Sequence, residues 1–264
     1  MSAYLAFAQS AFQTSLAYRN EVWANLFGKL LQVLARVAIW FAVYAGATSI
    51  GGVSLAEMIT YALLGGAVTG AIRYEAIVGG IGNALKTGDV AVWLLKPVSY
   101  PIYVIVSELG AAAYKFIFMV VPTVAVVALA YGMLPPASLF HGLMFVLYWI
   151  LAFAIISLIS ALLGLIAFWL LTSFALEWTM QALLNLLSGI LIPFWFFPEP
   201  FAAIARHLPF AWIVYYPSAV WLGRLSPAET LTYFGLGLVW AAAMAVGVAL
   251  LWRKASTRII VQGG

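Results

Sequence analysis

Cysteine is absent from this 264-residue sequence, and charged residues are scarce. Without cysteine the chain has neither disulfides nor thiolate metal sites. Charged residues make up only 8% of the chain, against about 25% in a typical soluble domain. Hydrophobic residues make up 66% of it, and the mean hydropathy is +1.09. This composition predicts an all-α integral membrane protein and argues against a soluble globular domain.

Residues suited to catalysis or metal binding are also few. His141 and His207 have no acidic or cysteine partner close in sequence, so we expect no metal site. The run from Gly80 to Thr87 has leucine where a phosphate-binding loop needs glycine before its lysine, so we expect no nucleotide site on this chain. The net charge of +4 is not typical of a nucleic-acid-binding protein. An intramembrane enzyme, with Ser188 as the deep hydroxyl, is a weaker alternative.

Six apolar runs approach or exceed the length of about 20 residues that a membrane-spanning helix needs. Glycine and proline turns separate most of them. Pro122 predicts a kink in the third run. The predicted spans are residues 25–46, 55–72, 102–131, 140–171, 177–197 and 228–252.

Two further segments are apolar without the features of a simple span. Residues 1–21 place Leu5 and Phe12 on one helical face with polar residues mostly off it, which predicts an interfacial helix. Residues 197–227 are rich in tryptophan, tyrosine and phenylalanine, which settle at the headgroup level. We therefore expect short helices dipping into the outer leaflet there, as a re-entrant region before the last span.

Lysine and arginine predict the orientation, because cytoplasmic loops of membrane proteins carry an excess of them. With both termini inside, eight of these residues lie at the inner side and two at the outer side. The inner group is Arg19, Lys29, Arg73, Lys86, Lys96, Arg253, Lys254 and Arg258, and the outer group is Arg206 and Arg224. Both termini are therefore predicted to be cytoplasmic.

Residues 79–101 form the longest interruption of the apolar pattern, and they fall on the predicted cytoplasmic side. A turn is expected at residues 87–89, followed by a short helix that Pro97 ends. We interpret this segment as the docking loop for a partner that supplies energy. Trp93 either anchors that partner or inserts into the inner headgroup region. The residues assigned to coupling are Thr87, Gly88, Asp89, Trp93, Leu95, Lys96 and Pro97.

Polar residues recur at helical spacing in the fifth predicted span: Glu177, Gln181, Asn185 and Ser188. Polar groups facing lipid are costly, so this face must meet protein or water. The stripe either lines a translocation path or forms hydrogen bonds between packed helices. Arg36 in the first span presents the same choice, between facing the path and reaching toward the inner headgroups.

Several motifs resemble the ABC-2-type transporter permeases. The segment KTGDVAVWLLKPVSYP is similar to their cytoplasmic signature, in which a glycine-acidic pair precedes a Leu-Leu-basic-Pro element. LAYRNEVWANLFGKLLQVL resembles their interfacial entry into the first helix. Their outer region is matched by Pro193 to Pro198, then Leu208-Pro209-Phe210, Tyr216-Pro217 and Gly223-Arg224. The resemblance spans nearly the whole chain, and the nearest branch is that of the viologen-exporter-like permeases.

The resemblance implies a single permease domain over residues 1–264, without catalytic activity, in the cytoplasmic membrane of a prokaryote. It implies a cytosolic ATPase subunit that binds ATP and magnesium, and a second permease chain, identical or different, surrounded by membrane lipids. Export of an amphipathic or hydrophobic cargo by alternating access is the expected function, with no cofactor on this chain. The rival interpretation is a six-helix substrate-binding subunit of an uptake transporter.

Overall fold

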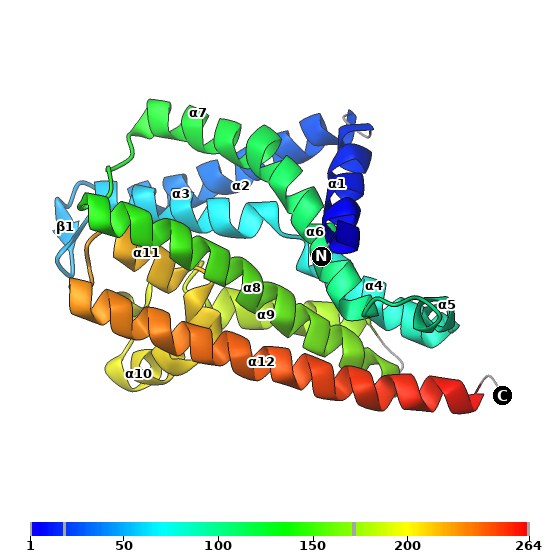
Figure 1. Cartoon of the computed structure of the whole chain (residues 1–264). Helices are drawn as coiled ribbons and strands as arrows, with labels where there is room; N and C mark the ends of the chain where they lie inside the picture. The colour runs from blue at the N-terminus through cyan, green and yellow to red at the C-terminus, as the bar shows by residue number, and fades with distance from the viewer. Residues whose placement is uncertain (1, 18–19, 171–172, 263–264) are drawn as a thin grey trace.

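The computed structural model describes residues 2–17, 20–170 and 173–262, and the chain in it runs back and forth between two ends of a helical bundle (Figure 1). Arg19, and with it part of the predicted interfacial segment, lies outside the described residues. The first half of the chain contains α1 (Ser2–Ala17), α2 (Asn20–Tyr44), β1 (Ser49–Ile50), β2 (Val53–Ser54), α3 (Leu55–Ala71), α4 (Tyr74–Thr87), α5 (Val90–Leu94), α6 (Tyr100–Lys115), the π-helix η1 (Phe116–Val120) and α7 (Val121–Tyr131). The two strands form a small antiparallel hairpin.

The second half begins with the long helix α8 (Leu139–Leu170), which is apolar on all sides. It continues with α9 (Phe174–Leu187), the 3-10 turn η2 (Phe194–Phe196), α10 (Glu199–His207), the 3-10 turn η3 (Pro209–Trp212), α11 (Tyr215–Trp221) and α12 (Pro227–Gln262). Within the described residues, five helical stretches are long and apolar enough to cross a membrane. This agrees with the predicted all-α membrane fold.

Helix α8 forms the centre of the core. It runs alongside α12 in the same direction and also packs against α4 and α11 (Figure 1). Tyr148, Ile155 and Leu165 on it are fully buried. A helix that is hydrophobic all round must be buried or face lipid, and α8 does both, because Leu139 and Leu143 on it remain exposed.

The segment from residue 79 onward was predicted as a loop, but it is helical as far as Thr87. Its Gly82 serves close packing between α4 and α8 instead of a turn, together with Gly164 of α8. A side chain at Gly82 would meet Ala167, and one at Gly164 would meet Ile81, each at 2.9 Å. The chain turns only at Gly88, whose φ of 80° is the left-handed geometry that favours glycine.

The fifth predicted span, residues 177–197, is not one spanning helix. Helix α9 has 14 residues, which at 1.5 Å each is about 21 Å and too short for a hydrocarbon core of about 30 Å. Ser188 ends it, and Gly189 turns the chain with φ of 80°. The chain then continues through η2, α10, η3 and α11. Residues 209–220 in this segment are all buried. The predicted short helices are therefore present, and their position in the outer leaflet stays a prediction.

The predicted kink at Pro122 takes the form of a bend between α6 and α7 (Figure 1). Pro122 comes just after a π-helical turn, and its missing N–H removes one hydrogen bond from the helix that continues from α6. The turn before it widens into the π-helix η1, and Val121 N donates to Phe116 O there. A π-helical turn is a recognised cause of a bend, so the local sequence accounts for the change in direction.

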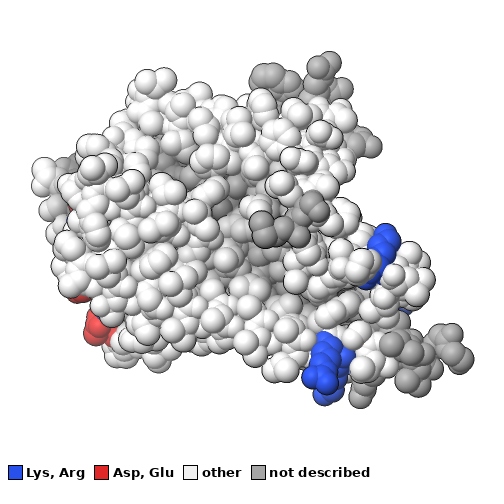
Figure 2. Space-filling view, viewed as in Figure 1, with Lys and Arg blue, Asp and Glu red and all other residues white. Residues whose placement is uncertain are grey.

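Charge separates the two ends of the molecule. Figure 2 shows lysine and arginine at the end that contains α5 and the last turns of α12, and acidic residues at the opposite end near α10. At the α10 end, Arg206 pairs with Glu199 at 3.1 Å and Arg224 with Glu57 at 2.6 Å. Among the described residues of the α5 end, Lys86, Lys96 and Arg253 form no ion pair. The α5 end therefore has the excess of positive charge that the sequence predicted for the inner side.

Helix α1 crosses the direction of the long helices and packs against α6 (Figure 1). The contact depends on Gly110, because a Cβ built there would lie 2.0 Å from Ala8 O. Phe7 of α1 also packs edge-on against Tyr103, with ring centroids 4.9 Å apart. Helix α1 therefore lies across the bundle axis, and the interfacial position of residues 1–21 stays a prediction.

Substituting Gly110→Ala should detach α1 from α6, because backbone atoms cannot move aside as a flexible side chain would. We expect a lower midpoint of thermal unfolding in detergent and faster proteolytic removal of α1. Gly235→Ala is the matched control, since nothing lies within 4 Å of its Cβ position. Equal behaviour of the two variants would mean that the α1–α6 contact contributes nothing to stability.

Candidate functional site

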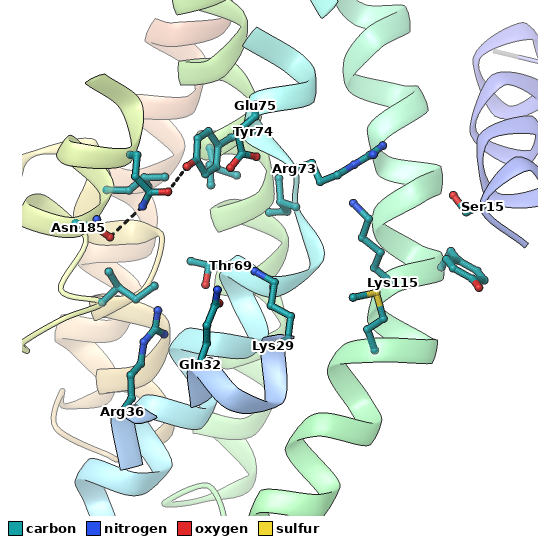
Figure 3. Close-up of a pocket in the computed structure, with 18 of the residues that line it drawn as sticks. Ser15, Lys29, Gln32, Arg36, Thr69, Arg73, Tyr74, Glu75, Lys115 and Asn185 are labelled. Carbon is teal, nitrogen blue, oxygen red and sulfur yellow. Dashed lines mark hydrogen bonds between the residues drawn. The ribbon is translucent and has the colours of Figure 1, made fainter. Parts of the chain in front are cut away.

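A cavity of about 800 Å³ lies within the bundle, between α2, α9 and the junction of α3 with α4. Helices α1, α6 and α8 complete its wall. Four cationic side chains and one carboxylate line it: Lys29, Arg36, Arg73, Lys115 and Glu75 (Figure 3). Charged groups within membrane-spanning helices are costly unless they are paired or meet water or a ligand. This cavity is therefore the strongest candidate for a functional site.

The α2 side of the cavity consists of one helical face. Lys29, Gln32 and Arg36 are three and four residues apart, so they lie on the same side of α2. Figure 3 shows all three extending from α2 into the cavity. Within the described part of the chain, none of the three makes an ion pair or side-chain hydrogen bond.

A break between α3 and α4 forms the neighbouring wall. Ile72 has extended backbone geometry, so the helix stops and Arg73 N must find a partner outside it. Glu108 Oε1 of α6 accepts that hydrogen bond at 3.0 Å. Glu108 is 5% exposed and also pairs with Arg73 Nη2 and Lys115 Nζ, each at 3.3 Å. One carboxylate therefore pairs with two cations, which leaves a net charge of +1, and stabilises the break.

On the α9 side, three side chains form a hydrogen-bonded chain. The Tyr74 hydroxyl donates to Gln181 Oε1. Gln181 Nε2 in turn donates to Asn185 Oδ1 at 3.1 Å (Figure 3). The chain links α4 to α9 and uses the oxygens of both amides, so the Asn185 amide nitrogen remains as a donor toward the cavity.

The predicted polar stripe of α9 therefore divides. Gln181 and Asn185 line the cavity together with Arg36, and Gln181 also forms a hydrogen bond between helices, to Tyr74 of α4. That these residues line a translocation path stays a prediction. Glu177 instead lies against α4, with its Oε1 3.0 Å from a Cβ position at Gly79. Ser188 is fully buried at the end of α9, where its hydroxyl donates to Leu184 O and accepts from Ile190 N.

The residues assigned to coupling gather at the α5 end. The Thr87 hydroxyl donates to Asp89 Oδ2 at 2.6 Å across the turn at Gly88. Trp93 is not exposed as an anchor would be. It packs on Tyr103, with ring centroids 4.0 Å apart, and Lys96 Nζ lies 3.9 Å above its ring. Exposed side chains at this end include Leu95 (87% exposed), Lys96 and Pro97.

Several cavity residues were not predicted as functional. Lys29 and Arg73 were counted only for orientation, while Gln32, Tyr74 and Glu108 were not singled out. The spacing of Lys29, Gln32 and Arg36 on one helical face is a signal that the sequence offers. Glu108 and Lys115 are seven residues apart, which also places them on one face of a helix. Nothing in the sequence pairs Tyr74 with Gln181, which is 107 residues away.

The two histidines lie outside this cavity. His141 Nε2 is 3.1 Å from Leu225 O, and its Nδ1 is 2.8 Å from Ser138 Oγ. His207 Nδ1 is 2.8 Å from Ala203 O. His141 therefore forms its contacts at the start of α8 and His207 within α10. Neither ring forms a described hydrogen bond with Ser188. Among the described residues, neither histidine lies with the cavity residues in an arrangement suited to acid–base or nucleophilic catalysis.

Comparison with known proteins gave one family match. The model of a family described as ABC-2 family transporter protein matches residues 30–263. The match covers most of the chain, including every element that surrounds the cavity except α1 and the first part of α2. A search of the curated proteins found no match.

Substituting Glu108→Gln should destabilise the fold, because it leaves the cations of Arg73 and Lys115 unpaired. Losing one partner of a buried ion pair costs about 3–5 kcal/mol, and we expect the lower part of that range because the Arg73 side chain is 59% exposed. The midpoint of thermal unfolding in detergent measures this. Adding Lys115→Gln should recover part of the loss.

Glu199→Gln is the control for this experiment, because its pair with Arg206 has an exposed carboxylate and contributes at most about 1 kcal/mol. If Glu108→Gln were no less stable than Glu199→Gln, the carboxylate would not hold the break between α3 and α4.

Proposed function

The chain belongs to the ABC-2 transporter family, and we propose that it is the permease subunit of an exporter that loads an amphipathic cargo into the cavity between α2, α4 and α9. Permease subunits of this family work with an ABC ATPase, so ATP binding and hydrolysis occur on a separate chain. The cavity is the observation that carries the proposal. Its volume of about 800 Å³ is within the range of ligand pockets, about 300–1,000 Å³, and its polar lining would otherwise be costly in a membrane.

The α4–α5 corner is the proposed docking site for the ATPase. Val92 and Leu95 on this short segment are exposed, although they are large and apolar. The segment is also firmly attached: Trp93 packs on Tyr103 of α6 and on Phe7 of α1. A partner that moves α5 would therefore move α1, α4 and α6 with it, and these helices carry residues of the cavity wall.

Export is the proposed direction, and the hydrogen-bonded turn at the α10 side of the cavity supports it. Ile190 lines the cavity and belongs to the turn that follows α9. That turn is tied to the core on both sides: the Tyr61 hydroxyl donates to Gly189 O at 2.9 Å, and Tyr215 N donates to Ser188 O at 3.0 Å. At its other end the cavity reaches Thr14 and Ser15 of α1. With the α5 end in the cytoplasm, as the lysines and arginines indicate, cargo would enter from inside.

A second permease chain, identical or different, is the proposed partner within the membrane. Helix α2 supports this, since only 11% of its apolar window is buried by the rest of the chain. Ile39, Phe41 and Val43 on it are exposed and need lipid or protein around them. Ile39 and Val43 continue the helical face of α2 that carries Gln32 and Arg36, so a partner packed on this face would lie beside the cavity.

Substituting Leu95→Asp should weaken binding of the cognate ATPase, because a buried apolar contact would have to accommodate a charge. We expect the yield of ATPase that co-purifies with the tagged permease to fall severalfold, with the same loss in basal ATP hydrolysis by the complex. Leu139→Asp is the matched control, since Leu139 is 79% exposed at the opposite end.

Equal loss in both variants would point to general damage and remove the support for docking at α5. If wild-type permease retains no ATPase, the proposed pairing itself is wrong. High-affinity capture of a small molecule by the isolated chain would then favour an uptake subunit.

A further inference from the structure

We propose that the cavity is an anion site, in which Lys29 and Arg36 bind a phosphate or similar anionic headgroup of the cargo. The inference deepens the proposed function and rests on it in one respect, that a cargo enters this cavity. It adds the chemical class of that cargo. The family resemblance implied an amphipathic or hydrophobic cargo, whereas the cavity lining is rich in cations.

The charges of the cavity do not balance. Glu108 is behind the wall and is already engaged by Arg73 and Lys115. Glu75 is the one carboxylate among the described lining residues, and it lies in the first turn of α4, where a negative charge stabilises the helix. When both carboxylates are counted against the four lining cations, two positive charges remain. Lys29 and Arg36 on α2 form no ion pair among the described residues, and Glu75 attracts Lys29 without forming an ion pair with it.

The neutral polar groups of the cavity also favour an anion, because they offer donors. Asn185 accepts from Gln181 through its oxygen, which leaves its NH₂ group without a described acceptor. Gln32 lies between the two cations on the same face of α2 and makes no described side-chain hydrogen bond. Guanidinium, ammonium and amide N–H groups around one space match phosphate oxygens.

The same α2 residues border a second, mainly apolar cleft. Lys29, Gln32 and Arg36 line it together with Val33, Leu63 and Val124. Thr123 also lines it, is 5% exposed and has a hydroxyl without a hydrogen-bond partner among the described residues. A ligand that entered this cleft could supply the acceptor that this hydroxyl lacks, such as the ester carbonyl that joins a headgroup to an acyl chain. The free volume is only about 30 Å³, so a chain would enter as α2 and α7 separate. An anionic amphiphile fits this combination better than a soluble anion.

The test is ligand binding by the full-length permease in complex with its ATPase, measured by native mass spectrometry and by thermal stabilisation. The probes are short-chain phosphatidylglycerol and phosphatidylcholine with identical acyl chains, and inorganic phosphate. We expect the wild type to bind phosphatidylglycerol more tightly than phosphatidylcholine. Lys29→Gln and Arg36→Gln should each weaken phosphatidylglycerol binding about tenfold, the effect of one charge-assisted hydrogen bond, and leave phosphatidylcholine unchanged.

Two controls separate the site from general effects of charge. Arg253→Gln removes an exposed cation of the α5 end that does not line the cavity, and it should bind both lipids as the wild type does. Arg36→Lys keeps the positive charge and should recover most of the binding lost in Arg36→Gln. Co-purification of the ATPase is recorded for each variant, so a failure of permease assembly is distinguished from a failure of anion binding.

Each outcome decides the proposal. Preference for phosphatidylglycerol that depends on Lys29 and Arg36 supports it with a lipid as the source of the anion. Inorganic phosphate binding as tightly as phosphatidylglycerol, with the same dependence, supports the anion site and assigns it to a soluble phosphate. Equal binding of the two lipids, or binding unaffected by both substitutions, overturns it.

Discussion

The carboxylate of Glu108 is the constraint on which the candidate site depends. It accepts the backbone hydrogen bond that the break between α3 and α4 leaves open, and it pairs two cations that would otherwise be costly in a membrane. The break then turns Tyr74 toward α9, where its hydroxyl donates to Gln181. Through these contacts one buried acid connects α6, α4 and α9 around the cavity.

The arrangement separates stabilising charges from charges available to a ligand. Arg73 and Lys115 are engaged by Glu108, whereas Lys29 and Arg36 on α2 form no ion pair among the described residues. Helix α2 is also the spanning helix least covered by the rest of the chain. If α2 moved, the positions of Lys29 and Arg36 would change, while the ion pairs of Glu108 with Arg73 and Lys115 would stay intact. In a transporter, this separation would allow the side chains proposed to contact the cargo to move while the ion pairs of the supporting wall stay in place.

Close helix packing links this cavity to the proposed energy input. Gly82 and Gly164 allow α4 and α8 to approach, and Gly110 allows α1 to lie against the backbone at α6. Trp93 then joins α5 to α1 and α6 through aromatic contacts. The α5 end therefore consists of packed helices that move together, and a force applied at Leu95 would be transmitted toward Tyr74 and Lys115. The glycines at the start of residues 79–101 favoured a loop in the sequence-based prediction, because glycine is common both in turns and where helices pack closely.

The sequence by itself determined the membrane class, five of the six predicted spans, the bend at Pro122 and the short helices of the aromatic segment, because each follows from local composition or from helical periodicity. It also singled out Arg36, Gln181 and Asn185, since polar residues inside an apolar run are conspicuous. Only the tertiary structure decided which polar residues meet. Tyr74 and Gln181 are 107 residues apart, and a break in a helix, not a pattern in either segment, brings them together. Ser188 fits the same helical spacing as Gln181 but ends its helix in the core, because periodicity identifies a face and not what that face contacts.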